Sequence, residues 1–222
     1  MKYKQSIINT IEMAIAYVML ILIVVFSPYI VKLGNTAGVK MLLTVMVYII
    51  FTAVPLIIMK LRKIPFKSLG FSKGNISKQL SVAAAIFIVT ISVAVVIPLL
   101  AGLNKTDVLS FKASSLQVLI FYVFYDIICV GFGEEIAFRG YFYSRIKDTW
   151  SAEWLAAVAS ALLFGLLHFP NTLNIINVVM TSILGLGYGI CRWKIKNCSL
   201  LSLALAHGVH DAVITILSYV LL

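Results

Sequence analysis

Long runs of apolar residues, separated by short polar or charged segments, recur along the whole chain. Because a helix needs about 20 mostly apolar residues to cross a bilayer, these runs predict seven membrane spans. The spans cover residues 7–31, 39–59, 80–103, 116–143, 154–169, 172–191 and 199–222. Only Pro170 and Asn171 separate the fifth from the sixth, so six to eight segments also fit. The pattern therefore predicts an all-α, polytopic membrane bundle of about seven transmembrane helices.

Composition supports a membrane environment. Of the 222 residues, 62% are apolar and 12% are charged, whereas a soluble domain has about 45–50% apolar and 25% charged residues. So few charged residues cannot cover a water-soluble surface, and a soluble enzyme or a disordered chain is a poor interpretation. We predict a multi-pass protein of the cell (plasma) membrane, with the lipid bilayer as partner. The formal net charge of +10 gives no reason to predict binding to nucleic acid.

The basic residues predict the orientation, since Lys and Arg collect in cytoplasmic loops. If the N-terminus is cytoplasmic, four of the 18 basic residues lie on the non-cytoplasmic side, and Arg139 lies within the fourth span. With a cytoplasmic N-terminus, 13 of the 18 fall on the cytoplasmic side: Lys2, Lys4, Lys60, Arg62, Lys63, Lys67, Lys73, Lys78, Arg145, Lys147, Arg192, Lys194 and Lys196. The positive charge is therefore an orientation signal.

Ionisable side chains inside spans are costly, and they usually mark function. The first three spans hold only Glu12, near a membrane edge, and the only long hydrophilic stretch is the loop 60–79. We therefore predict one integral-membrane domain over 1–222, with accessory spans in 1–103 and a catalytic core in 116–217. That core holds Asp126, Glu134, Glu135, Arg139, His168, His207, His210 and Asp211.

Helical spacing sorts these groups. Glu135 and Arg139 are four residues apart, acid before base, so they can pair on one face. Glu134 is rotated by about 100° from Glu135 and can point elsewhere, which gives the two acids separate roles. His207 and Asp211 can likewise share a face. Asp126 is interpreted as a structural hydrogen-bonding group, and the glycines at 185, 187 and 189 predict close helix packing.

Three motifs follow one another along the chain. They are Glu134-Glu135-Ile-Ala-Phe-Arg139 (EExxxR), Phe164-Gly-Leu-Leu-His168 (FxxxH) and His207-Gly-Val-His-Asp211 (HxxxD). In this order and in apolar helices, they resemble the CPBP family, the CAAX-prenyl-protease and bacteriocin-processing (Abi) intramembrane proteases. The resemblance implies an intramembrane endopeptidase that hydrolyses a membrane-associated or secreted peptide or protein. It also suggests a place in bacteriocin processing or self-immunity.

The resemblance implies a role for each motif residue. Glu134 would activate water, His168 would hold that water, and Glu135 with Arg139 would hold the site together. His207 and Asp211 would orient the substrate carbonyl or stabilise its oxyanion. Family members often have Asn where this chain has Asp211, and an ionised Asp only accepts hydrogen bonds. A role in orienting His207 or in binding a metal is favoured for Asp211.

Two questions stay open at this point. A metal-free glutamate mechanism and a Zn²⁺-assisted one stand as equal alternatives, and His168, His207 and Glu134 are the candidate metal ligands. The alternative functions are a non-catalytic membrane immunity or binding protein and a small proton-coupled transporter, in which the buried acids and histidines would relay protons.

Overall fold

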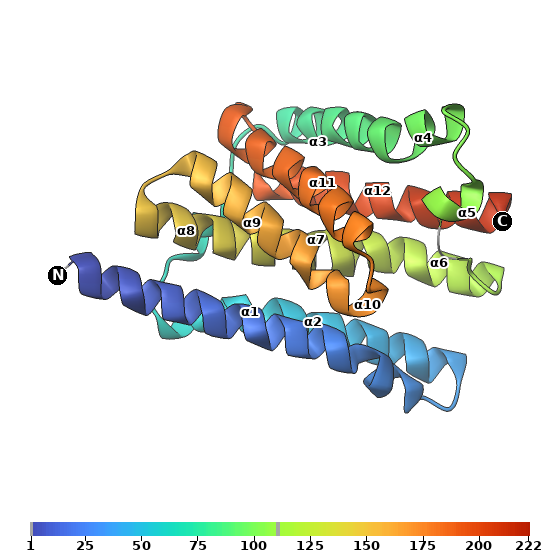
Figure 1. Cartoon of the computed structure of the whole chain (residues 1–222), viewed down its shortest axis with the longest axis horizontal. Helices are drawn as coiled ribbons and strands as arrows, with labels where there is room; N and C mark the ends of the chain where they lie inside the picture. Colours follow the sequence, from blue (N-terminus) through green and yellow to red (C-terminus); the bar gives the residue numbers. More distant parts are fainter. Residues whose placement is uncertain (1, 110–111) are drawn as a thin grey trace. The chain divides into compact units, whose positions relative to one another are not determined.

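The computed structural model describes residues 2–109 and 112–222, and all secondary structure in these residues is helical (Figure 1). Within this part of the chain, seven helical stretches are long and apolar enough to cross a membrane. They confirm the predicted all-α class and the number of spans. Their bounds are Tyr3–Lys32, Ala37–Leu61, Ile76–Leu100, Leu116–Trp150, Glu153–Thr172, Ile175–Lys194 and Leu200–Leu221.

Several spans consist of more than one helical element. The fourth contains two π-helical segments, η3 and η4, and the third contains one, η2. In chain order the elements are α1 (Lys2–Lys32), α2 (Ala37–Leu61), the 3₁₀ turn η1 (Phe66–Leu69), α3 (Ile76–Ile91), η2 (Ser92–Val96), α4 (Ile97–Leu100), α5 (Lys105–Val108), α6 (Leu116–Tyr125), η3 (Asp126–Val130), α7 (Gly131–Glu135), η4 (Ile136–Phe142), α8 (Tyr143–Trp150), α9 (Glu153–Leu167), α10 (Phe169–Thr172), α11 (Ile175–Lys194) and α12 (Leu200–Leu221).

Polar residues set the helix starts. Thr36, Asn75, Ser115, Asn174 and Ser199 each precede a long helix, and each side chain accepts a hydrogen bond from a backbone N–H of the first turn. Those N–H groups have no partner within the helix itself. These short polar side chains therefore mark where the helices start.

The contacts divide the chain into two units, each drawn from both halves of the sequence. The first comprises Met1–Phe71 and Gly133–Lys196, and the second comprises Ser72–Phe132 and Asn197–Leu222. In the first unit α1 lies antiparallel beside α2, and α9 packs on α11 (Figure 1). In the second unit α12 packs on α3, α6 and η3. The predicted division into accessory spans and catalytic core rests on the motifs and stays a prediction.

The fourth span is longer than the apolar run predicted, since it continues through α8 to Trp150. The prediction ended this span at residue 143 and put Arg145 in a cytoplasmic segment. In the structure Arg145 belongs to α8, and its side chain is only 9% exposed. A charged residue was taken as the end of the helix, but its charge is balanced inside the first unit.

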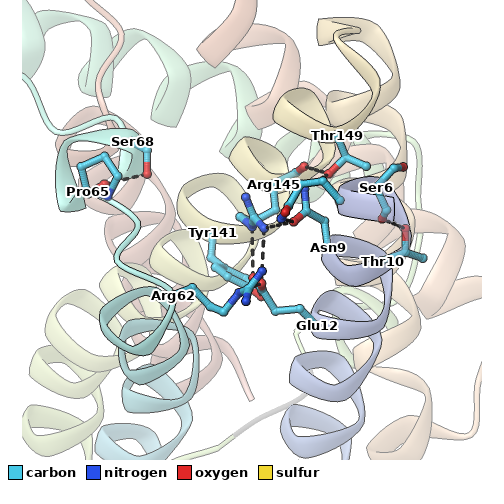
Figure 2. Close-up of polar contacts among 11 residues, drawn as sticks. Ser6, Asn9, Thr10, Glu12, Arg62, Pro65, Ser68, Tyr141, Arg145 and Thr149 are labelled. Carbon is cyan, nitrogen blue, oxygen red and sulfur yellow. Dashed lines mark hydrogen bonds and ion pairs between the residues drawn. The ribbon is translucent and has the colours of Figure 1, made fainter. Parts of the chain in front are cut away.

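The balancing charge is Glu12 of α1, which is also buried (Figure 2). Its carboxylate accepts hydrogen bonds from Arg145 Nε at 3.1 Å, from Arg62 Nε at 2.9 Å and from the Tyr141 hydroxyl at 2.9 Å. Arg145 Nη2 also donates to Asn9 Oδ1 at 2.7 Å. These five residues, which we call the Glu12 cluster, join α1 and the end of α2 to η4 and α8.

We predict that Glu12→Gln lowers the stability of the protein by about 3–5 kcal/mol, because it leaves the buried Arg145 guanidinium without its counter-ion. The substituted amide group would also present N–H donors to a guanidinium that has only donors. Thermal or denaturant unfolding of the purified protein in detergent measures the change.

Glu153→Gln is the matched control in the same unit. Glu153 pairs with Lys147, but their side chains are 32% and 48% exposed, and such a pair contributes about 0–1 kcal/mol. Glu153 also accepts a hydrogen bond from the Tyr143 hydroxyl, which the amide oxygen of a glutamine can still accept. Equal losses for the two variants would contradict the importance assigned to the Glu12 cluster.

Candidate active site

The two acids of the EExxxR motif end α7, and the π-helical segment η4 begins at the next residue. Glu134 is 5% exposed and Glu135 is fully buried. π-helical segments are rare and are frequent at functional sites, and this one starts directly after the paired acids. The two carboxylates are thus presented at a change of helical geometry inside an apolar span.

Glu135 forms an ion pair with Arg139, whose Nη1 lies 2.8 Å from Glu135 Oε1. Neither side chain is exposed. The guanidinium carbon of Arg139 lies 4.3 Å from the centre of the Phe164 ring and 5.4 Å from that of Tyr188, distances typical of cation–π contacts. Arg139 therefore connects η4 to both α9 and α11. The predicted pair on one helix face is present.

Glu134 contacts a residue outside the motifs. The hydroxyl of Tyr48, on α2, donates a hydrogen bond of 2.7 Å to Glu134 Oε1. Sequence reasoning missed Tyr48, because a tyrosine among the apolar residues of a span carries no motif and is ordinarily read as packing or as an interfacial anchor. Its position near the middle of α2 was the available signal, since a hydroxyl in the middle of an apolar span needs a partner.

His168 lies where α9 ends and α10 begins. Pro170 sits in the first turn of α10 and has no N–H to continue the α9 ladder, so the helix breaks at the histidine. His168 Nδ1 lies 2.9 Å from the carbonyl oxygen of Phe164. Since a carbonyl only accepts, Nδ1 carries the hydrogen in this contact, and Nε2 of the neutral ring carries the lone pair.

Phe164 joins the first two motifs. Its ring packs against Phe138 of η4 at 5.2 Å and against His168 at 4.9 Å between ring centres. The same ring contacts the Arg139 guanidinium. Phe138 and Arg139 of the first motif therefore pack against Phe164 of the second within the first unit.

The HxxxD residues belong to the second unit, on α12. His207 is buried, and its Nε2 lies 3.4 Å from Asp211 Oδ2. Nearby on η3, Asp126 Oδ2 accepts a 2.7 Å hydrogen bond from the Thr215 hydroxyl, which fits its interpretation as a structural group. The helices approach closely, since a Cβ on Gly208 would lie 2.6 Å from Ile127 Cα.

The sequence named Glu134, His168 and His207 as candidate metal ligands. Within neither unit do the described residues bring together three or more His, Cys, Asp or Glu side chains that could hold a metal ion. We therefore derive no step of the chemistry through a metal.

The geometry defines a class of protein, a polytopic membrane protein with buried acids and histidines in apolar helices. A comparison with protein families narrows this class. Residues 116–213 match the family of type II CAAX prenyl endopeptidase Rce1-like proteins. Comparisons with curated proteins and with solved structures gave no match.

The matched stretch includes all three motifs and covers just under half of the chain. Residues 116–213 are thus similar to an Rce1-like CAAX prenyl endopeptidase (CPBP) domain, which confirms the resemblance seen in the motifs. The matched family is, by its description, one of endopeptidases, and the seven candidate spans indicate an integral multi-pass membrane protein.

We predict that Gly185→Ala destabilises the first unit by about 1–3 kcal/mol, the usual cost of overpacking a core. A Cβ at this position would lie 2.8 Å from Arg139 Nη2 and 2.9 Å from Phe164 Cδ1. Both side chains are buried, so neither can move away cheaply. Thermal unfolding in detergent is the measurement.

Gly187→Ala, two residues along the same helix, is the control. The predicted packing role of Gly187 is wrong, because a Cβ there would meet nothing within 4 Å. This variant should be neutral or slightly more stable, since Ala favours helix over Gly by about 1 kcal/mol. A loss as large as that of Gly185→Ala would show that helix α11 and not the Arg139 contact is the sensitive feature.

Proposed function

We propose that the protein hydrolyses a peptide bond of a membrane-associated or secreted peptide, with Glu134 as the general base that activates water. The observation that carries this proposal is the kind of donor that contacts each of the two adjacent buried acids. Arg139 is ion-paired with Glu135, whereas Tyr48 holds Glu134 through a donor without charge. Glu135 serves as a structural counter-ion, and Glu134 serves as the reacting carboxylate.

The chemical step is an addition followed by an elimination. Glu134 takes a proton from water while the water oxygen bonds to the carbonyl carbon of the substrate. The resulting tetrahedral carbon expels the amine nitrogen as the C–N bond breaks, and the proton held by Glu134 passes to that nitrogen. The lone pair on His168 Nε2 suits it to accept a hydrogen bond from the attacking water. Arg139 and Glu135 hold the helix that carries the base.

The roles of His207 and Asp211 are proposed from the HxxxD motif. His207 would donate a hydrogen bond to the carbonyl oxygen, where negative charge develops. Asp211, whose carboxylate lies 3.4 Å from His207 Nε2, orients that ring instead of donating to the oxyanion itself. This assignment explains how an Asp can stand where an amide is more usual.

The proposed setting is the plasma membrane, with the N-terminus in the cytoplasm. The distribution of the 18 basic residues supports this orientation. By the family resemblance, the physiological role proposed is bacteriocin processing or self-immunity.

We predict that Glu134→Gln abolishes cleavage, since losing a general base costs about 10²- to 10⁴-fold in rate. New peptide N-termini can be mapped in membranes from cells that express wild type or the variant. Wild type should generate termini that the variant does not. Two quenched fluorescent peptides with a C-terminal CAAX sequence, one farnesylated and one free, then measure the rate of purified protein in detergent.

Glu153→Gln is the control, because it removes a half-buried acid of the same unit that lies outside the motifs, and it should cleave normally. Immunity or processing that survives Glu134→Gln unchanged would refute the protease and favour a binding protein. A transporter would be favoured if a peptide crosses the membrane of proteoliposomes without being cleaved and only when a proton gradient is present.

The orientation predicts which loops face each side. In a variant whose native cysteines are replaced by Ser, a cysteine at the exposed Ser72 should react with an impermeant maleimide only in inverted vesicles. A cysteine at the exposed Asn104 should react only in right-side-out vesicles. The opposite pattern would overturn the cytoplasmic placement of the N-terminus.

A further inference from the structure

Tyr48 is an unusual residue for its place in the fold. It lies 11 residues after the start of α2, which ends 13 residues later, so it sits near the middle of an apolar span. Tyrosines of membrane helices ordinarily lie near the interface, where the hydroxyl reaches water. Burying a hydroxyl without a partner costs about 1–3 kcal/mol in proteins. The partner of this one is Glu134 Oε1, 2.7 Å away.

The contact is built into the packing of α2 on the motif helix. Gly133 precedes the acids, and a Cβ on it would lie 2.7 Å from Thr52 Oγ1 and 3.3 Å from Tyr48 Cδ1. Only a residue without a side chain allows α2 this close. The Tyr48 ring also packs against Phe51, with 5.5 Å between ring centres. The phenol is thus held by its own helix and by the glycine that faces it.

The chemistry of the contact suits a general base. A phenol that donates to a carboxylate oxygen stabilises the ionised form and fixes the rotation of the carboxylate. Because the donor is uncharged, it does so without adding a positive charge beside the acid. Arg139, by contrast, is a positively charged donor, and it is ion-paired with Glu135.

We propose that Tyr48 is a positioning residue for Glu134, which makes α2 part of the catalytic apparatus although it lies outside the family-matched stretch. The inference rests on the proposed role of Glu134 as general base. It adds to that role a partner from a span that carries none of the motifs.

Tyr48→Phe tests the proposal, because it keeps the ring and removes only the donor. With the quenched farnesylated CAAX peptide in detergent, kcat should fall about 10- to 100-fold, as expected for the loss of a hydrogen bond to a charged group. KM and the unfolding temperature should stay within error of wild type. Replacing Tyr48 by fluorotyrosines of increasing acidity should change kcat progressively, which a purely structural ring would not do.

Tyr17→Phe is the matched control. Its hydroxyl, on α1, donates a 2.9 Å hydrogen bond to the carbonyl oxygen of Leu163, so the same group is lost between two helices of the same unit. This variant should keep kcat and KM within about twofold, as expected of a change away from the motifs.

A double-mutant cycle separates the two proposals. Glu134→Asp draws the carboxylate back by one methylene, beyond the reach of Tyr48, so Tyr48→Phe should cost much less in that background. No new termini in membranes and no cleavage of either peptide by wild type, or full cleavage by Glu134→Gln, would overturn the proposed function and this inference with it. If wild type cleaves and Glu134→Gln does not, normal kcat in Tyr48→Phe refutes the positioning role alone. The positioning role is also refuted if the loss of activity in Tyr48→Phe is explained by a raised KM or by a lowered unfolding temperature.

Discussion

The ion pair between Glu135 and Arg139 places two full charges where neither side chain touches solvent. Removing such charges from water costs several kcal/mol per ion, and their attraction offsets this only with good geometry and further contacts. Arg139 Nε and Nη2 have no hydrogen-bond partner among the described residues, and the guanidinium lies against the rings of Phe164 and Tyr188 instead. The pair is therefore compatible only with η4, α9 and α11 in one arrangement, so the charges fix how these helices pack.

Local features of this arrangement could be predicted from the sequence. The spacing of Glu135 and Arg139 predicted their pairing, although it assumed an α-helix and the structure has π-helical geometry from Ile136 onward. The wider turn alters the angle between residues four apart, but a long flexible side chain such as arginine can absorb the change. Pro170, which the sequence marked as an interruption between apolar runs, lies just after the break at His168, and it interrupts the helix because the absence of an N–H is a property of the residue itself. The apolar runs predicted the spans because hydropathy, too, is a property of the residues themselves.

Contacts between distant spans could not be predicted in this way. Whether Tyr48 meets Glu134, or Arg145 meets Glu12, depends on the depth and rotation of helices that lie 86 and 133 residues apart in sequence. A charge in an apolar segment can mark the end of a helix or the site of a buried partner. Arg145 was read in the first sense, although Glu12, the one acid of the first three spans, was the available sign of the second. Gly187 shows the same limit, since which glycines of a stripe face a neighbour depends on helix rotation.

The N-terminal spans hold the motif helix at two places. Tyr48 of α2 contacts Glu134 at the motif, and Glu12 of α1 binds Tyr141 and Arg145 further along the same span. One contact leaves a helix able to rotate about it or to tilt, whereas two contacts on different turns fix both rotation and tilt. The donor of the first contact, Tyr48, and the acceptor of the second, Glu12, both come before the family-matched stretch at 116–213. In the proposed mechanism the matched stretch carries the reacting groups, while the spans before it supply the side chains, Tyr48 and Glu12, that hold the motif span.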